Sequence, residues 1–414
     1  MTDLSPHARA VSLSLRHLKL FESVARLSSV RRASEECHLS QPAVTQAIAK
    51  LEEQIGLTLL ERRASGSYLN DCGKIFQRRI QRLFAQIEEA LEELGAPIGP
   101  TPIPIIASRI TRSQIRSLIA IVENGSFGQA ARALQVSQAS LHRAARDLEQ
   151  NLRKTLYHRT AFGIMATPPA AEFARKLKLA AREIESGIEE LEAATGNFGS
   201  QMVIGAMPLA GSVMLASVLN EFITSSPSAN VRIASSNADE ILRNLRAGDV
   251  DFVIGLVGDP PAPDLVSEAV VETPYVVVAR QGHPLLQKSA ATLEDLAAYD
   301  WVIGTPGSNR RQRFDKLFAD RARPMARVET SSMATIRLLL SNSDRLTLLT
   351  SYELKYAADM LKPVPFGALH PAPSVGLIMR ENWLPTPLQA KFLELFRQRV
   401  HGALEPAPTL KRVG

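Results

Sequence analysis

The sequence is poor in the features that mark secreted, membrane-bound or disulfide-rich proteins. It has two cysteines, Cys37 and Cys72, in 414 residues, too few for a disulfide framework and without the spacing of a zinc site. No apolar run approaches the ~20 residues that cross a bilayer, and residues 1–11 lack the apolar stretch of a secretory signal. We therefore expect a cytoplasmic protein with reduced cysteines, no membrane association, no metal and no cofactor.

Catalytic arrangements are also missing from the sequence. No nucleophile–base pair, metal-ligand cluster or phosphate-cradling glycine loop is visible. Asp249 and Asp251 flank the start of a predicted buried strand without a partner base, and His283 precedes Pro284 in a loop, so we expect all three to be structural. The sequence thus predicts that the chain is not an enzyme.

Length and charge indicate several domains, one region of which meets a polyanion. A chain of 414 residues is too long for one compact core and predicts two to four domains. The net charge is +6. Residues 1–196 hold 26 basic and 21 acidic residues, and the remainder holds 22 and 21. The basic surplus therefore lies in the first half, as expected if that half binds nucleic acid.

An internal repeat dominates the first half of the chain. A shift of 97 residues superposes 18–94 on 115–191 without a gap, and such self-similarity indicates two copies of one structural unit. The matching pairs are Ser29 and Ser126, Ala33 and Ala130, Ser40 and Ser137, Gln41 and Gln138, Leu51 and Leu148, Glu52 and Glu149, Leu59 and Leu156, Arg62 and Arg159, Gly66 and Gly163, and Phe76 and Phe173.

Each copy predicts the same series of elements. Apolar residues recur at helical spacing around a short helix at 30–36 and a tight connection at 38–40, which is helix-turn-helix geometry. Ser40 suits the N-cap of the next helix, and Pro42 is tolerated in its first turn. The basic, turn-rich residues after Leu60 can form a small β wing. Helices at 74–94 and 169–194 then carry apolar residues every three or four positions, a seam for a partner helix.

The pattern changes between the copies and again after them. Residues 95–107 hold four prolines and two glycines, which predicts a stiff, extended linker. From residue 201 onward short strands alternate with helices, as in an open α/β sheet. We expect strands at 202–206, 231–234, 251–256, 275–279 and 301–304, and helices at 212–224, 238–247, 309–320 and 334–341.

These residues together resemble the LysR-type transcriptional regulators over nearly the whole chain. The strings that carry the resemblance are Ser-Gln-Pro-Ala-Val-Thr at 40–45, Leu-Glu-Glu at 51–53, Gly56, Leu59-Leu60, Arg62, Ile204-Gly205, Leu-Arg-Ala-Gly-Asp-Val-Asp at 245–251, Gly-His-Pro-Leu at 282–285, Thr-Leu-Glu-Asp-Leu at 292–296, Trp301 and Gly307-Ser308. The family has one DNA-binding unit per chain, whereas this chain has two.

The resemblance implies a multidomain fold with two tandem, α-rich winged helix-turn-helix domains and a two-lobed α/β effector domain like that of periplasmic binding proteins. We expect the first winged unit with its linker helix at 13–95, the Pro-rich linker at 96–109, the second unit at 110–196, the effector domain at 197–402 and a tail at 403–414. The implied partners are double-stranded DNA and a small-molecule effector, a sugar or an aromatic or organic acid. The resemblance also implies a homo-oligomer and would allow contact with RNA polymerase.

One helix surface in each copy is predicted to contact DNA. If Val44, Ile48 and Leu51 face the core, the opposite face presents amides and hydroxyls that fit the major groove, and nearby basic residues would contact phosphates. In the second copy this face is more basic, and Arg153 and Ala139 replace Gly56 and Pro42, so a scaffold that no longer reads bases remains an alternative. The predicted DNA-binding residues are Ser40, Gln41, Pro42, Thr45, Gln46, Lys50, Arg62, Arg63, Ser137, Gln138, His142, Arg143, Arg146 and Arg159.

The predicted effector site lies at the carboxyl ends of strands in the second half, where open sheets bind ligands. Hydroxyls and helix N-terminal N–H groups there suit a carboxylate or a polyol. The candidate residues are Met207, Pro208, Leu209, Ser235, Ser236, Asn237, Thr305, Gly307, Ser308, Ser331 and Ser332. We expect the basic helix with Arg310, Arg311, Arg313 and Lys316 to be a solvated face.

Two questions stay open at this level. The 13 residues at 95–107 can span ~45 Å, enough to run back along a helix of ~30 Å, so the long helices can pair antiparallel within one chain or pair like with like between chains. A transport solute-binding protein, an enzyme with nucleic-acid-binding arms and an anti-regulator whose extra unit blocks partners are the alternative functions.

Overall fold

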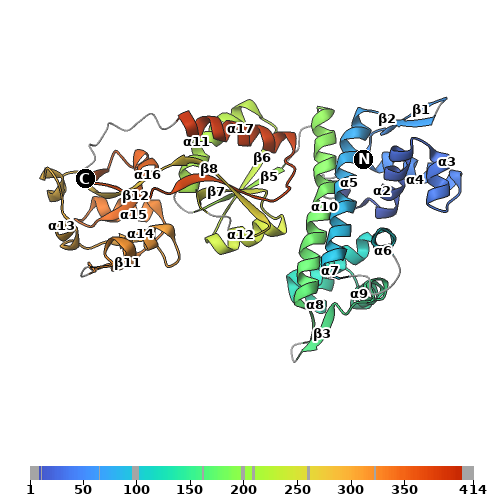
Figure 1. Cartoon of the computed structure of the whole chain (residues 1–414), viewed down its shortest axis with the longest axis horizontal. Helices are drawn as coiled ribbons and strands as arrows, with labels where there is room; N and C mark the ends of the chain where they lie inside the picture. Colours follow the sequence, from blue (N-terminus) through green and yellow to red (C-terminus); the bar gives the residue numbers. More distant parts are fainter. Residues whose placement is uncertain are drawn as a thin grey trace. The chain divides into compact units, whose positions relative to one another are not determined.

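The computed structural model describes residues 9–10, 12–64, 66–95, 102–160, 163–196, 201–207, 210–258, 262–320 and 323–402. The chain divides into two compact units, Met1–Ser200 and Gln201–Gly414, and each is described by itself (Figure 1). Within the described residues, no helix is both long and apolar enough to cross a membrane.

The first unit contains the same series of elements twice, which we call the first and second repeats. Each has three helices, a two-stranded antiparallel hairpin and a long helix. The first repeat comprises α2 (Leu15–Leu27), α3 (Val30–Glu36), α4 (Gln41–Ile55), β1 (Leu60–Arg63), β2 (Gly66–Leu69) and α5 (Asp71–Glu93). The second comprises α7 (Arg112–Asn124), α8 (Phe127–Leu134), α9 (Gln138–Leu152), β3 (Tyr157–Thr160), β4 (Gly163–Ala166) and α10 (Pro168–Ala194).

The helix caps explain why both repeats fold alike. Ser40 caps α4 by accepting from Ala43 N at 3.4 Å, and Ser137 caps α9 by accepting from Ser140 N at 3.1 Å. Side-chain oxygens at N-caps satisfy N–H groups that the helix cannot pair internally. Asn70 caps α5 by accepting from Gly73 N, so this helix begins three residues earlier than the sequence pattern predicts.

A glutamate side chain fixes each hairpin to its helix in the same way. Glu52 Oε1 accepts from the backbone N–H groups of Leu59 and Leu60 at 2.7 and 3.1 Å. Its counterpart Glu149 accepts from Leu156 and Tyr157 at 2.8 and 3.2 Å. Because these bonds repeat at the 97-residue shift, the duplication extends from the sequence to the hydrogen bonds that join side chains to the backbone.

The prediction of an extended linker at 95–107 is wrong for its second part. Residues 96–101 lie outside the described residues, but Ile103–Arg109 form a short helix, α6. Pro104 is compatible with a helix because it occupies the first turn, where no intrahelical N–H bond is lost. Ile106 and Ala107 are buried in the core of the first unit, so tertiary burial outweighs the extended preference of the prolines.

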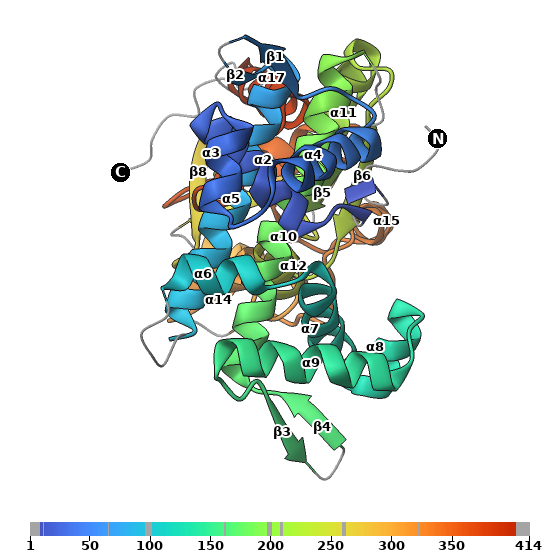
Figure 2. The ribbon, with the colours of Figure 1, turned by 90° about the vertical axis from the view of Figure 1, so that its right-hand side faces the viewer.

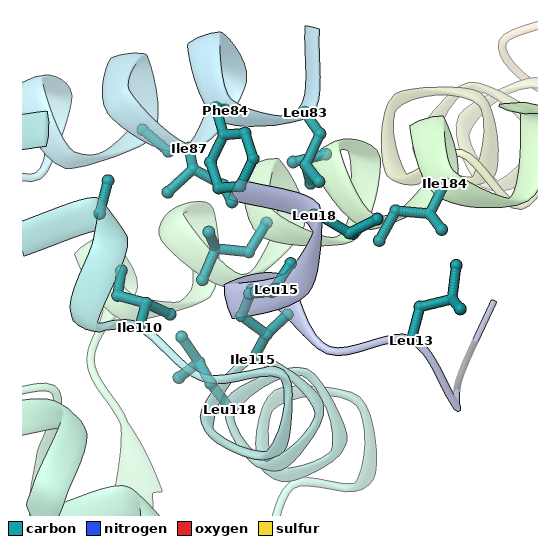
Figure 3. Packing of buried hydrophobic residues seen from close by; sticks show 14 of the residues in the cluster. Leu13, Leu15, Leu18, Leu83, Phe84, Ile87, Ile110, Ile115, Leu118 and Ile184 are labelled. Carbon is teal, nitrogen blue, oxygen red and sulfur yellow. The ribbon is translucent and has the colours of Figure 1, made fainter. Parts of the chain in front are cut away.

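The two long helices α5 and α10 lie side by side, with the first repeat at one end of the pair and the second repeat at the other (Figure 2). Both repeats share one hydrophobic core. Figure 3 shows residues of this core that correspond at the 97-residue shift, including Leu13 with Ile110, Leu18 with Ile115 and Ile87 with Ile184. Pairing of α5 with α10 within one chain is therefore the arrangement that the structure adopts.

The second unit begins with a five-stranded sheet in the order β6-β5-β7-β14-β8. Strand β5 is parallel to β6 and β7, whereas β14 is antiparallel to β7 and β8. Helices α11 and α17 supply core residues on one face, among them Phe222 and Phe392, and α12 supplies Ile241 and Leu245 on the other. The elements are β5 (Gln201–Ala206), α11 (Ala210–Ser225), β6 (Asn230–Ser235), α12 (Ala238–Ala247), β7 (Phe252–Val257), β8 (Leu265–Glu272), β14 (Ser374–Arg380) and α17 (Pro387–Gly402).

A second sheet in this unit has its own core. Strand β9 lies between β12 and β13, antiparallel to both. Strands β10 and β11 are parallel, and a bridge between Trp301 and Leu346 brings β12 parallel alongside β10. The elements are β9 (Tyr275–Arg280), η1 (Pro284–Gln287), α13 (Leu293–Ala297), β10 (Val302–Ile303), α14 (Asn309–Leu317), β11 (Val328–Glu329), α15 (Met333–Ser341), β12 (Thr347–Thr350), α16 (Ser351–Lys355) and β13 (Leu361–Leu369).

The chain passes twice between these two sheets, once from β8 to β9 and once from β13 to β14. The predicted strand at 301–304 shortens to two residues, and the predicted helix at 309–320 ends at Leu317. The expected structural role of Asp251 is confirmed, because its Oδ2 accepts from Val203 N at 2.8 Å. That of His283 is confirmed as well, because Leu285 N donates to its Nδ1 at 3.1 Å.

Candidate nucleic-acid and effector sites

The exposed face of α4 is arranged as the sequence predicts. Val44, Ile48 and Leu51 are buried, while the opposite face is open to solvent. On that face Gln41, Pro42, Gln46 and Lys50 are exposed, and Thr45 is half-buried. Ser40, also exposed, is engaged as the N-cap. The face therefore presents amide and hydroxyl groups without intervening large apolar side chains.

The equivalent face of α9 carries more positive charge. Gln138, Arg143 and Arg146 are exposed, and Ser137 caps the helix. His142 differs from the prediction of a free reading group, because it is half-buried and stacked on Phe127, with ring centroids 4.3 Å apart. A stacked imidazole has less freedom to reach a base than an exposed one, so the two arginines are the stronger candidates on this face.

Arginines extend each candidate surface onto the hairpins. Arg62 and Arg63 on β1 are exposed, as is Arg159 on β3. Arg63 lies over the ring of Tyr68 and pairs with Glu61 at 3.0 Å, so it is held close to the hairpin. Near α4, burial first and then the charges of Lys50 and Arg16 lower the pKa of His17, which indicates a positive potential beside the exposed face of α4.

Three of the eleven predicted effector residues, Ser308, Asn237 and Ser332, serve as helix caps. Ser308 Oγ accepts from Arg311 N at 3.2 Å and donates to Thr305 O at 2.7 Å. Asn237 and Ser332 cap α12 and α15, and Ser236 donates to Glu240. Met207 and Ser331 are half-buried and Ser235 is exposed, Gly307 has a φ of +79°, and Pro208 and Leu209 lie outside the described residues.

Arg310 is a candidate ligand-binding residue that sequence reasoning missed. It was expected on a solvated helix face, but it is 3% exposed. One guanidinium nitrogen, Nη2, donates to Thr330 O, whereas Nε and Nη1 are buried without a hydrogen-bond partner among the described residues. Burial lowers the pKa of Arg310, and the negative charge of Glu353 acts in the opposite direction.

The position of Arg310 matches the expected place of a ligand in an α/β fold. Strands β10, β11 and β12 run parallel, and their carboxyl ends lead into α14, α15 and α16. Arg310 lies in the first turn of α14, Thr330 follows β11, and Thr350 caps α16. A buried guanidinium beside helix N-termini favours an anion. The available sequence signal was its spacing of four residues from buried Phe314, which placed it on the apolar side of α14.

The described residues hold no cluster of His, Cys, Asp or Glu that could bind a metal ion. Cys37 and Cys72 are both free thiols and half-buried. The geometry therefore presents two kinds of surface, exposed polar helices in the first unit and a buried cationic group at strand ends in the second.

Comparisons with known proteins give the same division. The family described as the LysR substrate binding domain matches residues 196–401, and the bacterial regulatory helix-turn-helix protein family of the LysR type matches residues 15–74 and 113–171. The HTH-type transcriptional regulator GalR of Pseudomonas putida is 32% identical over 93% of this chain and 97% of its own length. The regulator GbpR of Rhizobium radiobacter is 26% identical over 61% of this chain and 86% of its own length.

Among solved structures, a full-length variant of OxyR from Pseudomonas aeruginosa is similar in fold, with a TM-score of 0.50 at 17% identity over 70% of this chain and 94% of that chain. A helix-turn-helix segment followed by an α/β effector domain defines a DNA-binding transcriptional regulator whose activity a small molecule modulates. The chain belongs to the LysR family of these regulators, and the relatives named here are regulators rather than enzymes.

Proposed function

We propose that this regulator binds duplex DNA through two winged helix-turn-helix units on one chain, with α4 and α9 as the recognition helices. The support is that both repeats have the same caps and the same Glu-anchored hairpin. The first helix offers Gln41, Thr45 and Gln46 to base edges, and the second offers Arg143 and Arg146. Amides pair well with adenine and guanidinium groups with guanine.

The wing arginines would contact phosphates rather than bases. Arg62, Arg63 and Arg159 are exposed on hairpins next to the reading helices, and phosphate contacts position a protein without specifying sequence. Because α5 has 23 residues and rises 1.5 Å per residue, the helix pair is ~34 Å long. Reading units at its two ends would address half-sites at least about one helical turn apart.

We further propose that the second unit is a two-lobed sensor, like periplasmic binding proteins, and that its effector is a small anion held by Arg310. The single observation that carries this proposal is a guanidinium 3% exposed, at the carboxyl ends of parallel strands, with two nitrogens that have no hydrogen-bond partner among the described residues. Ordinarily a buried charge is paired or hydrogen-bonded. A carboxylate, as in an organic acid or a sugar acid, would supply the missing acceptors.

DNA binding can be tested with the full chain and a library of random duplexes. We expect enrichment of a sequence with two separated half-sites and an affinity that falls steeply with salt. Enrichment of one half-site alone would restrict base reading to one repeat, and no enrichment together with salt-independent binding would overturn the proposal.

Effector binding can be tested by comparing Arg310→Met with Arg311→Met. Arg311 neighbours Arg310 on α14 but pairs with Asp315 and Glu329 near the surface. Benzoate, gluconate and inorganic phosphate are the probes, with glucose as the uncharged control. Thermal unfolding followed by the fluorescence of Trp301 and Trp383, both in the second unit, should show stabilisation of the parent chain and of Arg311→Met by at least one anion.

The Arg310→Met chain should lose this stabilisation. Without ligand it should be at least as stable as the parent, because an incompletely paired buried charge has been removed. A strongly destabilised Arg310→Met chain would instead assign the residue a structural role, and an unchanged response to anions would place the effector elsewhere.

A further inference from the structure

A buried ionic cluster lies in one half of the interface between α5 and α10. Arg79 on α5 is 1% exposed. Its Nη1 donates to Glu183 at 2.8 Å and its Nε to Glu190 at 3.2 Å. Arg82 donates to Glu183 at 2.9 Å, and Arg78 donates to Glu190 at 3.3 Å. Two carboxylates on one helix thus accept hydrogen bonds from three guanidinium groups on the other.

The other half of the interface holds a smaller version of the same contact. At the 97-residue shift Arg79 corresponds to Lys176 and Glu190 to Glu93, and these counterparts also form an ion pair. The interface therefore has an approximate two-fold axis. The symmetry is incomplete because Gln86, which donates to Glu183 at 3.0 Å, stands where a strict repeat would have a second glutamate.

The packing of side chains also differs between the two halves of the interface between α5 and α10. Gly187 faces Phe76, and a Cβ atom at this glycine would lie 3.1 Å from Phe76 Cδ2 and 3.3 Å from Arg79 Cβ, closer than ordinary packing. The corresponding residue of α5 is Ala90, a buried alanine. Phe76 and Arg79 together thus fit the glycine-bearing surface of α10 better than the surface of a second α5.

Pairing of like helices would leave buried charges without adequate partners. In a pair of two α10 helices, Lys176 would replace Arg79, Arg175 would replace Arg78 and Leu179 would replace Arg82. Glu183 would then keep only Lys176 as a cationic partner. In a pair of two α5 helices, each Arg79 would meet one carboxylate, Glu93, and one neutral amide, Gln86. Buried charges that lose a partner strongly destabilise a fold, so every like pairing is destabilised.

We propose that the cluster of Arg79, Glu183 and Glu190 is a pairing code that selects α5 with α10 of the same chain over pairs of identical helices. Buried polar groups are known to fix partner and register between helices in this manner. Burial alone would lower the pKa of Arg79, but its hydrogen bonds to Glu190 and Glu183 raise it, so this guanidinium stays charged.

If α5 pairs with α10 of the same chain, one chain carries two different DNA-binding faces in a fixed arrangement. This consequence for DNA binding rests on the proposed function, whereas the pairing of α5 with α10 does not. With amides on α4 and arginines on α9, the matching DNA has two different half-sites and needs no palindrome. The surface of α5 that faces α10 is thus covered by the second repeat of the same chain rather than by a second copy of the chain.

Zero-length carbodiimide cross-linking of the full chain tests the pairing. This reagent joins Lys176 to Glu93 only where the two are in contact, as they are here. Normal and heavy-nitrogen-labelled chains are unfolded together in urea, refolded and cross-linked. We expect a Lys176–Glu93 linked peptide in which both halves carry the same isotope. Mixed-isotope peptides, or no such link, would overturn pairing within the chain.

A triple variant tests the code itself. In Arg79→Leu/Glu183→Leu/Glu190→Leu the three buried charges are replaced together by apolar groups, while Arg78 and Arg82 remain with side chains that reach solvent. Replacing a buried ion cluster as a whole often leaves stability unchanged. We expect the unfolding midpoint to stay unchanged and the yield of the Lys176–Glu93 link to fall several-fold. The yield falls because pairs of two α5 helices or two α10 helices, formed between chains, then compete with the α5–α10 pair. An unchanged yield would show that other contacts select the partner.

The matched control is Arg175→Leu. Arg175 lies on α10 and pairs with Glu172 of its own helix, so its loss should leave the cross-link unchanged. None of these measurements involves DNA, and a failure of the pairing code is therefore distinguishable from a failure of the proposed DNA binding.

Discussion

The two repeats of the first unit have the same backbone fold but different exposed side chains. Glu52 and Glu149 anchor their hairpins with nearly identical hydrogen bonds, yet the outward residues of α4 and α9 differ in charge. Backbone N–H groups at helix ends and hairpins need fixed partners whatever the molecule binds. The comparison teaches that both repeats retain these partners, while the exposed face is free to change.

The strongest test of this comparison replaces the two equivalent cations between the long helices. Arg79→Leu should lower the stability of the first unit by about 3–5 kcal/mol, because Glu183 and Glu190 stay buried without it. Lys176→Leu should cost only about 0.2–1 kcal/mol, because its partners Glu89 and Glu93 are largely exposed.

Urea unfolding followed by far-ultraviolet circular dichroism measures both effects. Fluorescence of Trp301 and Trp383 serves as the control, since both tryptophans belong to the second unit and their transition should not move. Equal losses in the two variants would show that the interface is electrostatically symmetric, contrary to the pairing code.

The hairpin anchors should be equally important in both repeats. Glu52→Leu and Glu149→Leu each leave two backbone N–H groups without an acceptor, at a cost of about 1–3 kcal/mol. The corresponding Gln variants keep an acceptor oxygen and should retain most of the stability. Chemical denaturation of all four variants makes the comparison, and a harmless Glu149→Leu would mean that the second hairpin is held by other contacts.

Base reading should separate the two faces. Gln46→Ala and Arg143→Ala should each weaken binding to the selected DNA by about 1–3 kcal/mol and relax sequence preference at one half-site only. Fluorescence anisotropy measures the affinity of each variant for duplexes in which one half-site or the other has been mutated, and random duplex DNA is the control. If Arg143→Ala weakened random and selected DNA alike, the second repeat would bind phosphates without reading bases.

The smallest effect concerns the residues that end α4 and α9. Gly56 and Arg153 occupy equivalent positions with φ values of +83° and +51°, and this left-handed conformation costs a non-glycine residue about 1–2 kcal/mol. Arg153→Gly should therefore stabilise the first unit by up to about 1 kcal/mol, part of the gain being lost to the greater freedom of glycine in the unfolded chain.

The reverse substitution, Gly56→Ala, should destabilise by a similar amount, because no atom lies within 4 Å of the added Cβ and only backbone strain changes. Both are measured by thermal unfolding. A destabilising Arg153→Gly would indicate that the arginine side chain contributes a contact that outweighs the strain.

Sequence reasoning located the elements best where a local signal is strong. The helix at 30–36 and the helix at 238–247 have the predicted bounds, because caps and apolar spacing are properties of neighbouring residues. Strands such as β8 and β14 were not predicted, since their partners are distant in sequence: β14 pairs with β7 and β8. The predicted effector site could not be settled from the sequence either, because a serine before a helix can cap the helix or bind a ligand.

The sequence by itself determined the duplication, which follows from comparing residues 97 positions apart. It also determined the Ser40 cap, the apolar seams of the long helices and the outward faces of α4 and α9, because each of these depends on residues within a few positions of one another. Only the tertiary structure decided that α6 is helical, that Arg310 is buried and that Arg79 meets Glu183 and Glu190 across 104 and 111 positions of chain. Burial and pairing of charge depend on which distant segments pack together, and the free energy of a buried charge depends on the partner it finds there.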